Sequence, residues 1–181
     1  MRSNNRELAA TALMAAVTAA LAWVVIPLPF TPVPVSGQTV GVMLAGLFLP
    51  PQLAALSQVI YIALGVLGLP VFAGGSAGLG TIFGPTGGYI WAFVLAALCI
   101  SWAVRKVPSS TRIGYFAILA LGGIGLIYVF GIIQLMAVTG IGLAQAVTAG
   151  ALPFLPGDLA KVLLVTEVAR RRPAFSSSAG L

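Results

Sequence analysis

The chain has 181 residues, of which 60% are hydrophobic and only 7% are charged. Ordinary soluble domains are about a quarter charged, so this composition excludes a water-soluble fold and favours a protein embedded in lipid. The net charge of +6 does not indicate a nucleic-acid-binding protein, because the basic residues stand in short groups that flank long apolar runs.

Two long stretches without a charged side chain indicate transmembrane helices. One runs from Leu8 to Val104 and the other from Ile113 to Gly157. A span needs about 20 apolar residues, and shorter or tilted spans occur in packed bundles. We therefore predict an all-α, polytopic membrane protein, with residues 1–181 forming a single membrane domain. Six transmembrane helices are expected at roughly 8–26, 37–49, 52–67, 88–104, 113–138 and 157–170.

Three connecting segments are expected to be mainly irregular. Alternating prolines over 27–36 disfavour helix and predict a stiff extended loop. The glycine-rich segment 68–88 is expected to be mainly non-helical. The segment 139–156 is too interrupted to span a membrane, although a short surface helix is possible over 141–150.

The distribution of basic residues predicts the topology. With six spans, both termini and the 105–112 loop share one face, and every Lys and Arg except Lys161 lies on it. That face is predicted to be cytoplasmic, which places a multi-pass protein in the cytoplasmic (inner) membrane with both termini inside. The long loops lie on the opposite face, and long structured loops often carry function. We therefore expect a binding site at the outer face.

Asp158 and Lys161 are the sharpest signal for such a site. They are the only charged residues between Arg112 and Glu167, and their spacing puts both on one face of the last predicted helix. A helix cap with an ion pair would account for them. Charges in membrane segments are costly and usually face the bundle interior, however, so we favour a polar ligand that completes their pairing.

Other candidate residues are less specific. Gly74, Gly75 and Ser76 offer backbone groups and close approach, but no Gly-Lys-Ser/Thr follows as in a phosphate-binding loop. Several polar or aromatic side chains are candidate cavity residues, although each alone is more often a packing residue. They are Gln38, Tyr89, Trp91, Phe93, Tyr128 and Gln134.

Ala12, Ala16 and Ala20 recur every four residues in the first predicted helix. This spacing puts them on one face and permits close contact with another helix. The residues alone leave open whether that helix belongs to this chain or to a partner.

The residue inventory argues against an enzyme. The chain has no His, three carboxylates and one cysteine, Cys99. Glu7 and Glu167 are predicted far from Asp158, so no carboxylate pair is available. No nucleotide-binding motif is present, so the chain is not expected to hydrolyse ATP. We expect no catalytic residue, no metal site and no cofactor.

Four stretches together resemble the BioY family, the biotin-binding membrane subunits of energy-coupling factor transporters. They occur in family order over nearly the whole chain: PFTPVPVSGQT (29–39), GLPVFAGG (68–75), FGPTGGY (83–89) and PFLPGDLAK (153–161). The resemblance implies six helices, high-affinity binding and uptake of biotin near the outer face, and cooperation with a transmembrane coupling subunit and ATPase subunits.

The resemblance also implies roles for individual residues. Asp158 and Lys161 would bind biotin, with the 68–88 loop closing over it. Asp158 can accept hydrogen bonds from the ureido N–H groups, and Lys161 can serve a ligand oxygen. Where the family often has an amide side chain in the glycine-rich loop, this chain offers Ser76. The face formed by Ala12, Ala16 and Ala20 would dock on the coupling subunit.

Three alternatives remain beside this interpretation. The chain could bind another small vitamin as a related subunit. A membrane-embedded enzyme acting on lipid is disfavoured by the missing His and carboxylate pair. A structural or assembly subunit would leave the Asp158/Lys161 pair unexplained.

Overall fold

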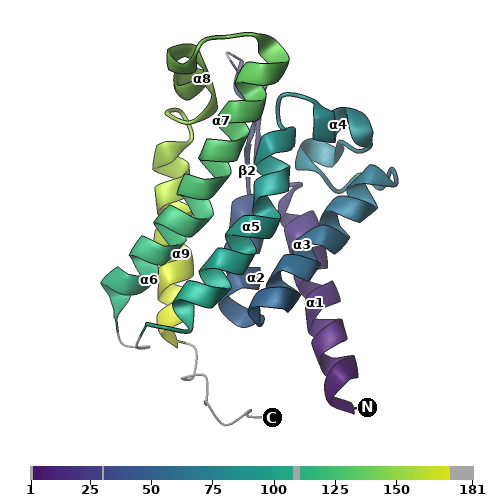
Figure 1. Ribbon diagram of the computed structural model, residues 1–181, viewed down its shortest axis with the longest axis vertical. Helices are drawn as coiled ribbons and strands as arrows, with labels where there is room; N and C mark the ends of the chain where they lie inside the picture. Colours follow the sequence, from purple (N-terminus) through teal and green to yellow (C-terminus); the bar gives the residue numbers. More distant parts are fainter. Residues whose placement is uncertain (1, 30, 108–110, 172–181) are drawn as a thin grey trace.

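The computed structural model describes residues 2–29, 31–107 and 111–171, with the side chains of residues 2–4 left aside. Long helical segments dominate it (Figure 1). They are α1 (Arg2–Leu21), α2 (Gln38–Phe48), α3 (Pro51–Val66), α5 (Gly87–Val104), α9 (Leu155–Arg171) and a continuous rod of α6 (Arg112–Ile118), the π-helical η2 (Leu119–Gly125) and α7 (Leu126–Thr139). The predicted all-α architecture is confirmed.

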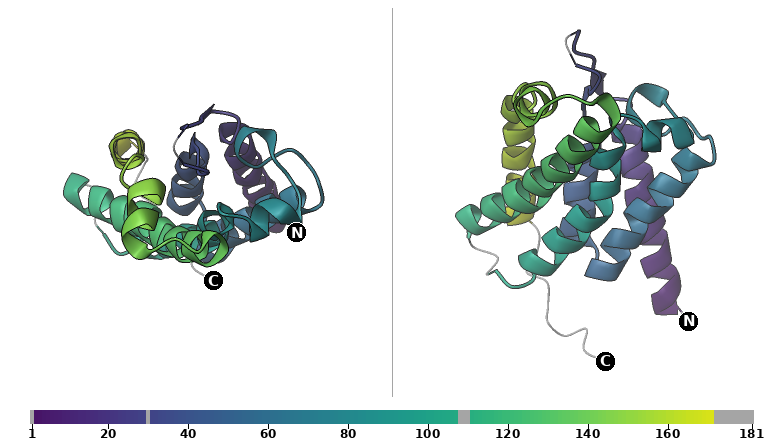
Figure 2. Two further views of the ribbon diagram at one scale, coloured as in Figure 1. Left: turned by 90° about the horizontal axis from the view of Figure 1, so that it is seen from above. Right: turned by 45° about the horizontal axis from the view of Figure 1, so that its top comes forward.

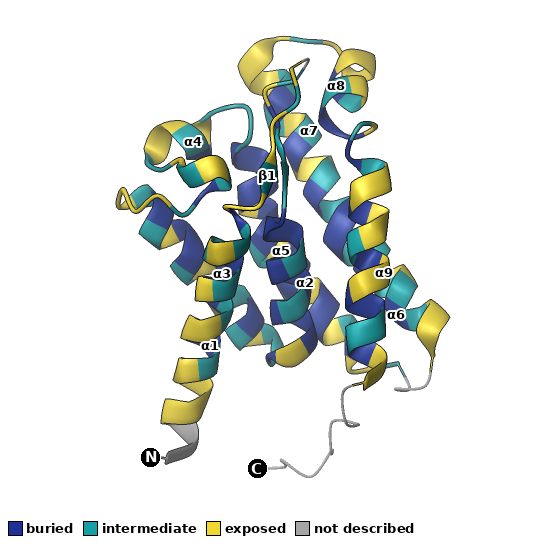
Figure 3. Cartoon of the chain, turned by 180° about the vertical axis from the view of Figure 1, so that it is seen from behind, coloured by how far each residue is buried: buried dark blue, intermediate teal, exposed yellow. Residues whose placement is uncertain are grey.

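The helices stack in two rows. Seen from above, α1, α2 and α9 lie in one row, and α3, α5 and the α6–η2–α7 rod lie in the other (Figure 2, left). The facing sides of the helices are buried, whereas their outer sides are largely exposed (Figure 3). Many exposed side chains are large and apolar, among them Leu13, Trp102 and Leu164. Such an apolar exterior suits contact with lipid.

Length and composition single out only some helices as membrane spans by themselves. Gly87–Val104 and Arg112–Thr139 are long and apolar enough, and α8 (Leu143–Gly150) with α9 qualifies if the pair, bent by 53°, is one span. At 1.5 Å per residue, α2 is about 16 Å long, well short of the ~30 Å hydrocarbon core. Its residues are mostly buried between neighbouring helices, so α2 is an interior element rather than an independent span. The predicted count of six spans is therefore approximate.

The first helix differs from its predicted range of 8–26. It begins at Arg2 and ends at Leu21, and β1 (Val25–Ile26) follows. This strand pairs antiparallel with β2 (Val35–Ser36), so the proline-rich segment predicted as a loop is part of a small hairpin. The prolines that follow Ile26 cannot continue a helix. The backbone groups of Val25 and Ile26 instead find their hydrogen-bond partners in β2.

The longer connecting segments, which follow α1, α3 and α7, gather at the end of the bundle opposite the chain termini (Figure 1). The 68–88 segment is mainly irregular, as predicted, but includes the 3₁₀ turn η1 (Ala73–Gly75) and the short helix α4 (Leu79–Phe83). The expected surface helix is present as α8. Together with the β1–β2 hairpin, these elements surround the same end of α2, α5, α7 and α9.

Tyr89 shows how glycines bring two helices close together at this end. Its ring lies against Gly131 of α7, where an added Cβ would overlap the ring. Its hydroxyl donates to the carbonyl of Gly150, at 2.8 Å, and so ties α5 to the end of α8.

Replacing Gly131 with Ala is therefore expected to lower stability by about 1–3 kcal/mol, because the Tyr89 ring must move. A helical Gly→Ala change without such a clash normally stabilises. The matched control is Gly125→Ala, since Gly125 has helical backbone angles and a Cβ there meets only the Ala120 carbonyl, at an ordinary 3.8 Å. Thermal unfolding of both variants in detergent measures the effect. A Gly131→Ala protein at least as stable as the native chain would contradict this packing.

Candidate ligand-binding site

A pocket of about 400 Å³ opens among the loops and the adjoining helix ends. Ligand pockets commonly measure about 300–1,000 Å³ and have mainly apolar walls. The hairpin and α2 contribute Pro32–Ser36, Gln38 and Thr39; the 68–88 segment contributes Ala73, Ser76, Gly80, Thr81 and Gly84–Thr86; and the remaining wall is formed by Tyr89, Ile90, Phe93, Ile127, Tyr128, Phe154, Asp158 and Lys161.

Asp158 and Lys161 form an ion pair on the wall of this pocket. Lys161 Nζ lies 2.7 Å from Asp158 Oδ1, and the side chains are 18% and 6% exposed, respectively. The local sequence explains the placement. Pro156 fits the first turn of α9, Asp158 follows near the positive end of the helix dipole, and Lys161 lies one turn further on the same face.

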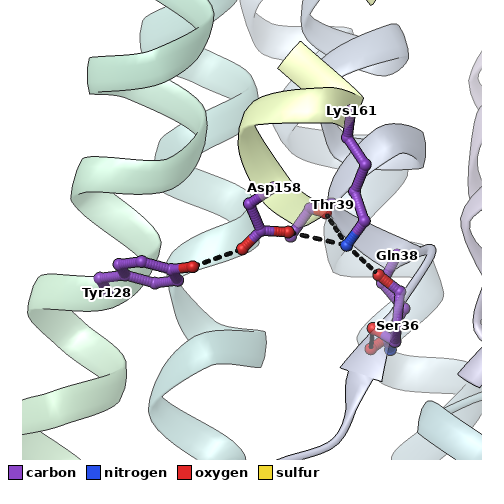
Figure 4. Close-up of polar contacts among 6 residues, drawn as sticks. All are labelled: Ser36, Gln38, Thr39, Tyr128, Asp158 and Lys161. Atoms are coloured by element: carbon purple, nitrogen blue, oxygen red, sulfur yellow. Dashed lines mark hydrogen bonds and ion pairs between the residues drawn. The ribbon is translucent and has the colours of Figure 1, made fainter. Parts of the chain in front are cut away.

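Side-chain and backbone groups from other elements form further hydrogen bonds with this pair (Figure 4). The Tyr128 hydroxyl of α7 donates to Asp158 Oδ2 at 2.5 Å. Lys161 Nζ donates to the Ser36 carbonyl of β2 at 2.6 Å and more weakly to Thr39 Oγ1 of α2 at 3.4 Å. The pair thus links α9 to α7, α2 and the hairpin. Each carboxylate oxygen accepts one of these bonds and retains capacity for another.

Five of the predicted binding residues line the pocket, namely Gln38, Ser76, Tyr89, Asp158 and Lys161. The Gln38 amide already has two partners, since it accepts from Ser36 Oγ at 2.8 Å and donates to the Tyr61 hydroxyl. Ser76 Oγ donates to the Ala73 carbonyl at 3.0 Å. These side chains therefore also shape the pocket wall.

Gly74 and Gly75, predicted as binding residues, are not among the residues that line the pocket. They form the η1 turn at positive φ, where glycine is favoured. The Gly74 N–H donates to the Ala22 carbonyl at 3.1 Å, and a Cβ on Gly75 would lie 3.0 Å from the Trp23 ring. Both glycines thus hold the loop against the residues that directly follow α1.

The remaining candidates divide clearly. Phe93 and Tyr128 line the pocket, whereas Trp91 is exposed on the outside of the bundle and Gln134 contacts the loop backbone instead. The structure also brings in Thr39, whose polar side chain in an apolar segment was a usable signal. The Ser36 carbonyl gives no such signal, because a backbone group is the same in every residue.

Ala12, Ala16 and Ala20 are all exposed, and the neighbouring Ala15 and Thr18 are buried. Their stripe therefore faces outward from the described part of this chain.

Among all the residues that the structure describes, no group of three or more His, Cys, Asp or Glu side chains could hold a metal ion. Fold and site together define a membrane-embedded helical bundle with a pocket for a small molecule.

Comparison with known proteins gives the family. The profile of the BioY family matches residues 1–177. The chain is 39% identical to the biotin transporter BioY of Rhodobacter capsulatus over 97% of both chains, and 33% identical to that of Rhizobium etli over 92% of both. The crystal structure of the S-component for biotin from an ECF-type ABC transporter matches with a TM-score of 0.87 and 31% identity, covering 94% of this chain and 92% of the other.

The chain therefore belongs to the BioY family. This is a family of membrane transporter components rather than of enzymes, so the expectation that the chain is not an enzyme is confirmed. The resemblance found in the four sequence stretches is confirmed as well.

Proposed function

We propose that this chain is the substrate-binding subunit of an energy-coupling factor transporter and captures biotin in the pocket for uptake. The observation that carries the proposal is the Asp158–Lys161 ion pair on the wall of a pocket of about 400 Å³. The likeness to the biotin S-component supports it. Biotin is the transported ligand in this proposal and not a cofactor.

The chemistry of the pocket suits biotin. Its ureido ring presents N–H donors beside a carbonyl acceptor, and Asp158 and Lys161 present an acceptor beside a donor, 2.7 Å apart. Asp158 would accept from a ureido N–H, and Lys161 would donate to the adjacent ureido oxygen. Hydrogen bonds to charged groups are the stronger kind. Apolar side chains such as Val33, Phe93 and Ile127 suit the thioether ring.

Equilibrium binding of labelled biotin to the purified protein tests this function directly. Unlabelled biotin should displace the label, whereas riboflavin and thiamine should not. Displacement by another vitamin at lower concentration would assign the pocket to that ligand. A purified, folded protein that binds none of them would favour a structural subunit.

Asp158→Asn should weaken biotin binding roughly 30- to 1,000-fold, because a charged acceptor becomes an amide whose N–H₂ group mismatches the ureido donors. Lys161→Met should also weaken binding. The double variant should lose less than the sum of the two, since both residues share one network. Glu167→Gln is the matched control, because this carboxylate pairs with Arg112 and Arg170 at the other end of α9. A folded Asp158→Asn protein with native affinity would remove Asp158 from the site.

We also propose that the protein lies in the cytoplasmic membrane with both termini inside. Among residues whose side chains are described, the basic ones other than Lys161 gather at the end of the bundle that carries the termini (Figure 1). Short loops rich in Lys and Arg remain cytoplasmic.

A cysteine introduced at Leu69 should react with a membrane-impermeant thiol reagent in intact cells, and one at Lys106 should react only after lysis. Both are made in a Cys99→Ala background, because Cys99 is exposed. Labelling of position 106 but not position 69 in intact cells would reverse the orientation.

The outward stripe of Ala12, Ala16 and Ala20 is proposed to dock on the transmembrane coupling subunit, which works with the ATPase subunits. Small side chains let two helices approach closely. The exposure of all three residues supports this proposal.

Ala16→Trp should leave biotin binding nearly intact and weaken co-purification with the coupling subunit, because bulk on this face blocks close approach. Leu164→Trp is the control for bulk on an exposed helix face, since Leu164 of α9 is 58% exposed. If Ala16→Trp lowered biotin binding and association alike, the stripe would not be a docking surface.

A further inference from the structure

Residues 79–86, called here the cover segment, form one side of the pocket. The segment consists of α4 and the turn that leads into α5, and it lines the pocket with Gly80, Thr81 and the turn residues 84–86. Very little apolar contact holds it in place. Ile82 is its one fully buried residue, whereas Leu79 is 56% and Phe83 is 68% exposed.

Gln134 of α7 binds the backbone of the cover segment from behind. Its Nε2 donates to the Ile82 carbonyl and to the Gly84 carbonyl, each at 2.8 Å. Both acceptors are carbonyl oxygens, so the contacting atom must be the amide nitrogen, and both of its hydrogens are used. Within the described residues, these are the only hydrogen bonds that tie the cover segment to a helix other than α5.

The start of α5 is shaped to let Gln134 reach these carbonyls. Gly88 lies against α7, and a Cβ there would come 2.7 Å from Gln134 Cβ. A Cβ on Gly87 would overlap both the Ile82 carbonyl and the Gln134 amide. Two adjacent glycines thus leave room for one side chain to bridge α7 and the cover segment.

We propose that Gln134 is a positioning residue that holds the cover segment closed over the pocket and thereby sets the rate at which ligand leaves. The ligand is biotin if the proposed function holds, and the inference rests on that function for its kinetic part. Gln134 is not among the pocket-lining residues, so it acts through the segment rather than on the ligand. With one buried apolar side chain in the segment, two hydrogen bonds are a large share of what keeps it docked.

The position of the cover segment is tested first, without ligand. Spin labels are attached to cysteines at Phe83 and at Leu143 of α8, both exposed, in the Cys99→Ala background. The distance distribution should be narrow with native Gln134. It should broaden with Gln134→Glu, which turns carboxylate oxygens toward the two carbonyls, and with the similarly sized Gln134→Met. Gln145→Glu adds the same charge on exposed α8 and should keep the distribution narrow.

The rate of ligand release is tested second. Labelled biotin should leave Gln134→Glu and Gln134→Met about 10- to 100-fold faster than the native chain, with a much smaller change in association rate. Narrow distances in both Gln134 variants would overturn the proposal, and so would broad distances with unchanged release. A native protein that binds no biotin would overturn the proposed function instead, and the distance distributions would still decide whether Gln134 holds the segment.

Discussion

The pairing of Asp158 with Lys161 is the constraint on which the arrangement of the loop end depends. Two charges largely removed from water must be paired and hydrogen-bonded, and loss of one partner from a buried pair costs roughly 3–5 kcal/mol. Neither side chain can satisfy the other alone. The Tyr128 hydroxyl gives the carboxylate a second donor, and the Ser36 carbonyl and Thr39 hydroxyl accept from the ammonium. The pair thereby fixes α9 relative to α7 and to the adjoining β2 and α2.

The same pair links stability to ligand binding. Its other bonds run to Tyr128, Ser36 and Thr39, with the Thr39 contact the longest at 3.4 Å. A ligand donor can be added at Asp158, whereas a ligand acceptor at Lys161 would replace the long Thr39 contact, because the ammonium has only three hydrogens to donate. The hairpin carries Ser36 and forms part of the pocket wall. Its position therefore depends on the hydrogen bond between Lys161 and the Ser36 carbonyl, and a ligand that binds Lys161 would affect it.

Much of this organisation follows from the sequence because it depends on local patterns. Long apolar runs predict the helices, and the two isolated charges at helical spacing lie together on the wall of the pocket. What was missed depends on backbone groups and tertiary contacts. The β1–β2 hairpin replaces the expected end of the first helix, because two-residue strands leave no periodicity to detect. Gly74 and Gly75 are predicted binding residues that do not line the pocket, because their role in the loop turn depends on tertiary contacts. Gln134 is one of several equivalent candidates in the sequence, and only the fold brings two carbonyls beside its amide.

The central claim is that the Asp158–Lys161 pair holds the ureido group of biotin. The most direct measurement is an experimental structure of the purified chain with biotin bound. The account predicts a ureido N–H within about 3 Å of an Asp158 carboxylate oxygen and the ureido oxygen within similar reach of Lys161 Nζ. Biotin bound in the pocket with its ureido group away from both side chains, or bound outside the pocket altogether, would contradict it.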